Sequence, residues 1–173
     1  YNSYGDSGMS SILKVDTIQT TAGAAPTTKD LGFAAGSVIQ TVSGAPSSEV
    51  SYSTTTETNV FTLNITPKFN TSKILILANF GLYLNSGAAQ ERGDFIIRRD
   101  TTLIRGRADG GGTGYFRDSS GRFKSYMTSF NHLDSPATTS QITYKMAWKG
   151  HTYTAGGTYD ENYTNMTLME IAQ

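Results

Sequence analysis

Residues 73–84 read KILILANFGLYL, and residues 142–150 read ITYKMAWKG. The first stretch is apolar at nearly every position and rich in β-branched and aromatic side chains, which is typical of a strand buried on both faces. Gly81 and the flanking asparagines disfavour the competing interpretation, a buried helix. The second stretch alternates between apolar and polar residues, the pattern of a strand with one buried face. Together the two stretches predict an all-β fold.

Further short stretches of the same kind are separated by turn signals every eight to twelve residues or so, giving about eight or nine strands in all. A hairpin is expected around Asp100–Thr101, between residues 93–100 and 101–108. This spacing predicts an antiparallel β-sandwich of jelly-roll type. Its core is expected to hold Phe61, Leu63, Ile74, Ile76, Phe80, Ile96, Tyr144, Met146, Trp148, Leu168 and Ile171.

The chain divides into an arm and one domain. Residues 21–36, TAGAAPTTKDLGFAAG, form a linker of small residues, and residues 12–20 before it have an extended pattern. Residues 1–36 are therefore predicted to be an extended N-terminal arm, used for attachment or for wrapping a neighbouring subunit, and residues 37–173 the sandwich. At 173 residues, the chain is long enough for a single domain with a sizeable core.

Composition excludes several classes of function. Fourteen basic residues balance fourteen acidic ones, and this neutrality disfavours nucleic acid and membrane surfaces as partners. The chain has no cysteine, which excludes disulfides, thiolate metal sites and cysteine catalysis. The hydrophobic fraction is only 37% although the chain holds ten Tyr and eight Phe. We therefore expect a core completed by oligomerisation, as a homotrimer around a threefold axis.

Catalytic motifs have little support, and we expect no enzyme activity, no cofactor and no metal site. His132 and Asp134 would share one face of a strand, but surface polarity is the default interpretation of such a pair. The run Asp109–Gly114, DGGGTG, lacks the GK[ST] ending of a phosphate loop and is interpreted as a flexible surface loop. The adhesion-type tripeptide Arg92-Gly93-Asp94 is most simply a turn before a strand.

The residues that follow the glycine-rich loop are the candidate receptor-binding site: Tyr115, Phe116, Arg117 and Asp118. Exposed aromatic rings stack on sugar faces, and neighbouring charged groups can hydrogen-bond hydroxyls. The alternative is that Tyr115 and Phe116 re-enter the core. The arginines between Arg98 and Arg122 are interleaved with aspartates, so we expect them in ion pairs across strands or between subunits.

Four phrases of the sequence resemble tail-fibre proteins of tailed bacteriophages, especially those of aquatic hosts. The phrases span nearly the whole chain, and the sequence departs most from the family in the stretch between them at about residues 85–122. They are MSSILKVDTIQTTAGAAPTTKDLGF with GSVIQ (9–33, 36–40), ITP with TSKILI (65–67, 71–76), LDSPATT with YK (133–139, 144–145) and LMEIA (168–172).

The resemblance implies a structural protein of a virion: a tail fibre or fibre tip that mediates attachment to a host-surface glycan or protein. Its arm would bind other virion proteins. The alternatives are a capsid-attached head fibre or decoration protein and, less favoured, a polysaccharide-degrading tailspike. The tailspike is disfavoured because the chain is short and shows no paired inward carboxylates.

Overall fold

The computed structural model describes residues 32–52, 56–84, 91–106, 114–116, 124–150, 157–159 and 163–173. Residues 1–31, which hold most of the predicted arm, lie outside these ranges. The described residues form strands and connections only, and none of them forms a helix able to cross a membrane.

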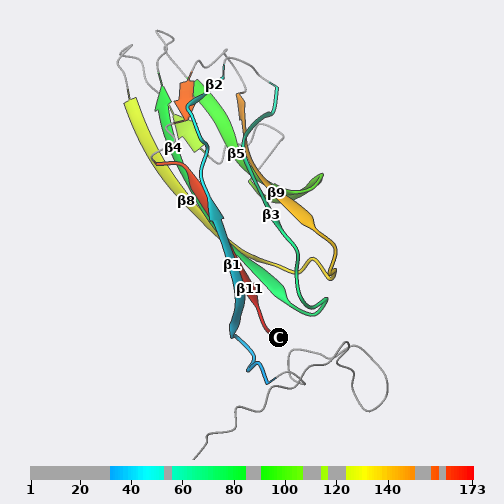
Figure 1. The fold of residues 1–173 in the computed structure, drawn as a ribbon. Helices are drawn as coiled ribbons and strands as arrows, with labels where there is room; N and C mark the ends of the chain where they lie inside the picture. The colour runs from blue at the N-terminus through cyan, green and yellow to red at the C-terminus, as the bar shows by residue number, and fades with distance from the viewer. Residues whose placement is uncertain are drawn as a thin grey trace, which may run out of the picture.

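The described residues of the domain form eight main strands and three short ones (Figure 1). The predicted strands at 73–84 and 142–150 are confirmed residue for residue, and β7 and β10, of three residues each, were not predicted. The strands are β1 (Val38–Gly44), β2 (Val50–Tyr52), β3 (Thr58–Ile65), β4 (Lys73–Leu84), β5 (Glu91–Arg99), β6 (Thr102–Gly106), β7 (Gly114–Phe116), β8 (Lys124–Asp134), β9 (Ile142–Gly150), β10 (Gly157–Tyr159) and β11 (Asn165–Ile171).

The strands pair into two antiparallel sheets that face each other. Sheet A has the order β8–β4–β11–β1, and β10 and β2 continue it beyond Asn165, the start of β11. Sheet B has the order β3–β9–β5–β6, with β7 beside the start of β5. Counted along the chain, the main strands of sheet A are the sixth, third, last and first, and those of sheet B are the second, seventh, fourth and fifth. This is the order of a jelly roll, so the predicted sandwich topology is confirmed.

The predicted hairpin is present between β5 and β6. Arg99 pairs with Thr102, and Asp100 takes a left-handed conformation with φ 51°. Aspartate tolerates this conformation better than most residues. The Asp100 amide donates to the carbonyl of Thr143, and its carboxylate accepts from the Thr143 amide, so the turn is tied to β9.

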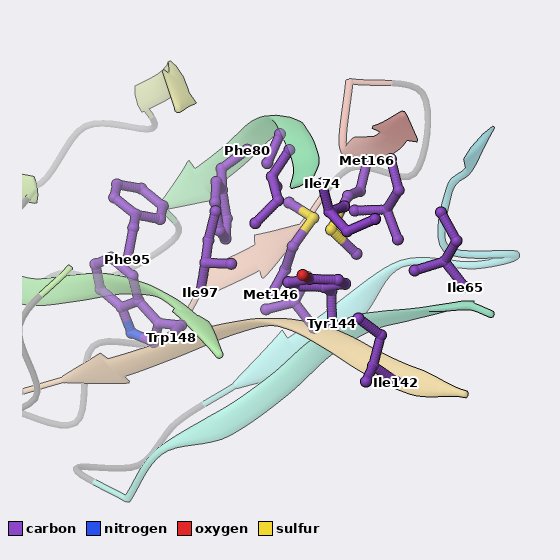
Figure 2. Packing of buried hydrophobic residues seen from close by; sticks show 14 residues of the cluster. Ile65, Ile74, Phe80, Phe95, Ile97, Ile142, Tyr144, Met146, Trp148 and Met166 are labelled. Carbon is purple, nitrogen blue, oxygen red and sulfur yellow. The ribbon is translucent and has the colours of Figure 1, made fainter. Parts of the chain in front are cut away.

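The core lies between the sheets and is dominated by aromatic and branched side chains (Figure 2). Eight of the eleven predicted core residues are buried, but Phe61, Leu63 and Ile171 are only half-buried. Phe61 and Leu63 point inward from the edge strand β3, where their tips reach the Cα of Gly44 on β1. Ile171 lies on the outer face of sheet A. The core also contains Val60, Ile65, Phe95, Ile97, Ile142, Met166 and Ala172, which were not predicted.

The prediction that β4 is buried on both faces is wrong for this chain on its own. Ile74, Ile76, Ala78 and Phe80 face the core and are at most 2% exposed. The alternate residues face outward: Leu75 is half-buried and Leu77 is 37% exposed. Within the described residues, no third layer covers this side of sheet A.

Neighbouring main strands run antiparallel, so the connections between them lie at two opposite ends of the domain. Residues 36–37, the C-terminal residues and the connections 66–72, 100–101 and 135–141 lie at one end, which we call the base (Figure 1). Here the amide of Gly36 donates to the carbonyl of Ala172, and the Ala172 amide donates to Ser37. The start of β5, the end of β4 and the start of β8 lie at the opposite end, the apex.

We predict that Gly81→Ala destabilises the domain. Gly81 lies at the point on β4 where the neighbouring strand changes from β11 to β10. A Cβ there would lie 2.4 Å from the Cβ of Tyr163, and the Gly81 amide and carbonyl both bond to the buried Thr164 hydroxyl. Forced overpacking of this kind costs about 1–3 kcal/mol. Urea unfolding should show the loss. Adding Tyr163→Gly should restore part of it, whereas a double variant no more stable than Gly81→Ala would contradict the steric explanation.

Candidate functional site

The structure places the predicted receptor-binding segment at the apex. Tyr115 and Phe116 lie on β7, where their backbones pair with Arg92 and Glu91 at the start of β5. Arg117 and Asp118 lie outside the described residues, as do residues 109–113 of the glycine-rich loop. The segment therefore lies at the end of the domain opposite the base. The described chain enters the domain at the base.

The tripeptide Arg92-Gly93-Asp94 is not a turn, because all three residues lie within β5. Asp94 is fully buried, in register with Lys149 of β9. A buried carboxylate in the middle of a sheet is not available to an adhesion receptor. The structure therefore corrects the predicted turn and removes this motif from the candidate sites.

A polar cleft of about 370 Å³ opens on the outer face of sheet B, and sequence reasoning did not identify it. Its walls carry two cations and two carboxylates, and Ala147 is the one apolar residue that lines it. Strand pairing brings the residues together, since Arg98 lies opposite Lys145 on neighbouring strands and Asn59 lies opposite Ala147. The lining residues are Glu57, Asn59, Arg98, Asp100, Thr101, Lys145 and Ala147.

A two-point ion pair holds one wall of the cleft in place. The Arg98 Nε and Nη2 atoms donate to the two carboxylate oxygens of Glu57 at 2.6 and 2.7 Å. The Arg98 Nη1 atom also donates to the carbonyl of Thr101 at 3.1 Å. The hydrogen bond from Arg98 lowers the pKa of Glu57 and, reciprocally, raises the pKa of Arg98. Both groups are therefore charged at neutral pH, and the guanidinium is oriented before any ligand arrives.

The cleft keeps unused hydrogen-bonding capacity. Among the described residues, the Lys145 ammonium makes no hydrogen bond or ion pair, and Arg98 uses only three of its five N–H donors. Asp100 accepts from Thr143 through one oxygen, and its other oxygen has no hydrogen-bond partner in the part of the chain that the structure describes. Donors and acceptors that face each other above a methyl group suit a hydroxyl-rich ligand. The balance of charges does not favour a strongly anionic one.

Asp134 is not a surface residue, so the default interpretation of the His132–Asp134 pair is wrong for this residue. Asp134 is 7% exposed and spans the two sheets near the base. One of its oxygens accepts from Arg99 at 2.7 Å and from the Tyr144 hydroxyl at 2.6 Å. Burial first, and then the Asp134 carboxylate, raises the pKa of Tyr144 far above its usual value. This cluster joins the sheets and faces no described pocket.

Glu170 is a third buried carboxylate, after Asp94 and Asp134, and sequence reasoning did not single it out. One oxygen accepts from the amides of Lys68 and Phe69, and the other accepts from the Gln40 side chain at 2.6 Å. The only signal in the sequence is its position in the alternating strand MTLMEIA, on the same side as Leu168. Its role is to fix the connection between β3 and β4. Within the described part of the chain, no three His, Asp or Glu side chains gather as metal ligands.

Comparisons with known proteins give only remote matches. No protein-family model and no curated protein sequence matches the chain. Among solved structures, infectious bursal disease virus of the Gx strain matches at 14% identity and a TM-score of 0.46, over 77% of this chain and 32% of that one. The VP2 subviral particle of the same virus matches at 15% identity and 0.43, again over 77% and 32%. Dimeric latent PorU from Porphyromonas gingivalis matches at 10% identity and 0.42, over 82% and 14%.

The chain thus spans about a third of the viral chains and a seventh of PorU. TM-scores below 0.5 at such identities carry no argument about what this protein does. The fold is therefore assigned from the strand order of this chain, and its function has to be inferred from its own residues.

Proposed function

We propose that this protein is a structural protein of a phage virion, the tip of a tail fibre, and that it mediates attachment to the host surface. The sequence phrases that resemble phage tail-fibre proteins support this proposal. A capsid-attached head fibre or decoration protein would use the same fold and is the second candidate.

The observation that carries the proposal is the polarity of the domain. The described chain enters at the base, where residues 36–37 bond to Ala172, and the candidate receptor-binding segment lies at the apex. An attachment protein needs this arrangement, with one end tethered to the particle and the other presented to the cell. In this proposal the arm, residues 1–36, binds other virion proteins, and the domain acts as a homotrimer without a cofactor.

The polarity can be tested directly on virions. Gold-labelled antibodies against the domain should mark the distal ends of tail fibres in electron micrographs. Label on the capsid shell would favour the head-fibre alternative, and virions without label would contradict the proposal.

We predict that replacing both Tyr115 and Phe116 with alanine lowers adsorption of the isolated protein to host cells by tenfold or more. Each aromatic contact to a sugar contributes about a kcal/mol, and the copies within each proposed trimer multiply the loss of each site. Fluorescently labelled protein and flow cytometry give the measurement, with circular dichroism to verify folding. Unchanged adsorption by a folded variant would remove Tyr115 and Phe116 from the binding site.

The cleft on sheet B provides the matched comparison in that experiment. Lys145→Ala removes an ammonium that supports no described hydrogen bond or ion pair, so the fold should remain intact. If adsorption falls with Lys145→Ala and not with the aromatic pair, the receptor site is the cleft rather than the apex. If neither variant changes adsorption, neither surface contacts the receptor.

A further inference from the structure

The outer face of sheet A carries an unusual amount of exposed apolar surface. Register places Met169, Leu75 and Leu133 in one row across three strands, and Leu77 lies in the next row. Leu133 is 46% exposed and Met127, further along β8, is 69% exposed. We call this surface the A face; its apolar members are Val38, Leu75, Leu77, Met127, Leu133, Met169 and Ile171.

The outer face of sheet B is built differently. It presents the charged side chains of Arg98 and Lys145 in one row, with Asp100 at the hairpin end. The A face has only one charged residue among its described outward side chains, Lys73, and the rest of its polar groups are Ser, Thr and Asn. The two layers therefore have opposite outer surfaces: one apolar and nearly uncharged, the other polar and charged.

The sequence of β4 also indicates that the A face is an interaction site. Its run KILILANFGLYL is apolar on both faces, as in strands that are covered on both sides. The folded chain covers only the face with Ile74, Ile76, Ala78 and Phe80. Leu75 and Leu77 are left on the other face, and contiguous exposed apolar surface of this kind marks an interaction site.

The charges indicate which partner fits. Near the symmetry axis of an assembly each side chain lies close to its own copies, so charges there repel one another and an interface between copies is favoured when its centre is nearly uncharged. The A face meets this condition, and its short polar rows are satisfied within the face: Ser129 donates to Asn79, and Asn79 donates to Asn165. A charged partner protein would find little to pair with there.

We infer that the A face is the contact surface between copies of this chain, with the sheets A turned toward the axis of the assembly and the sheets B turned outward. The inference deepens the proposed fibre-tip function and rests on its expectation of a homotrimer. Copies around a threefold axis all point the same way along it, so in this arrangement the bases, where β1 begins and β11 ends, lie together. The cleft on sheet B stays open to solvent.

The test is the molar mass of the full chain by light scattering between 1 and 100 µM. We expect the wild type to assemble and the Leu77→Asp, Leu133→Asp double variant to be a monomer with an unchanged far-UV spectrum. Leu103→Asp is the matched control, since Leu103 on β6 is 42% exposed but belongs to sheet B, and it should assemble as the wild type does. A monomeric wild type, or a double variant that still assembles, would overturn the inference.

A second measurement covers the case in which the double variant fails to fold. The chain has no cysteine, so single cysteines can be placed on either face. Asn131→Cys lies beside Leu133 on the exposed side of β8, and Thr62→Cys is exposed on sheet B. A short bis-maleimide should join copies of Asn131→Cys at least fivefold more than copies of Thr62→Cys. Equal yields, or more product from Thr62→Cys, would overturn the inference. Host adsorption reports separately on the proposed attachment function.

Discussion

Trp148→Ala should lower the free energy of unfolding by about 4 kcal/mol, the range expected for deleting a fully buried large aromatic side chain. Trp148 is 0% exposed and lies on β9, between β3 and β5. Its ring meets that of Phe95 edge to face at 5.0 Å, and Phe95 in turn contacts Phe80 of sheet A at 4.8 Å (Figure 2). The indole is thus one end of an aromatic chain that connects the two sheets, and alanine would leave a cavity there.

Urea unfolding followed by far-UV circular dichroism measures this effect, because Trp148 is the only tryptophan and fluorescence would be lost with it. All variants must be compared at one protein concentration, since assembly shifts apparent stability. Trp148→Phe fills part of the space and should cost less than half as much. A loss below about 1 kcal/mol for Trp148→Ala would show that the site collapses around the smaller residue.

Asp134→Ala is expected to cost about 3 kcal/mol, because it leaves two polar groups without the carboxylate that they share. The Tyr144 hydroxyl belongs to a fully buried residue, and Arg99 is largely covered. Removal of the acceptor therefore costs the desolvation of both groups as well as the lost bonds. Asp134→Asn keeps an acceptor oxygen and should be destabilised less.

A double-mutant cycle with Tyr144→Phe separates these contributions. Once the hydroxyl is gone, Asp134→Ala no longer orphans it, so the double variant should be at least 1 kcal/mol more stable than the sum of the single losses predicts. Thermal or urea unfolding of the four proteins gives the coupling free energy. Additive losses would mean that the Asp134–Tyr144 hydrogen bond contributes nothing measurable.

The strands were predictable because each follows a local rule. Alternation identified β9, a continuous apolar run identified β4, and turn residues identified the β5–β6 hairpin. Half-burial of Phe61 and Leu63 was not predictable, because it depends on β3 being an edge strand. The apolar run of β4 indicated that two faces need cover, but nothing in the run shows that the folded chain itself covers only one.

The candidate sites were less predictable than the fold. The cleft on sheet B joins Glu57, Asn59, Arg98 and Lys145, which are up to 88 positions apart (145 − 57) and become neighbours only through strand order. Asp134 was taken for a surface group because its strand gives no sign of the Arg99 and Tyr144 side chains on the opposite sheet. Tyr115 and Phe116 are candidates because they follow a glycine-rich loop and because aromatic rings stack on sugars, and their role stays a prediction.

The position of β11 sets the order in which this domain can form. It is the last strand along the chain, yet it lies between β1 and β4 and provides the hydrogen bonds that join them. During synthesis, the main strands of sheet B are all available before residues 165–171 emerge, whereas the first strand of sheet A must wait for the last. Such a distant pairing slows folding. A chain that stops before Asn165 would leave β1 without its neighbour and could not complete sheet A.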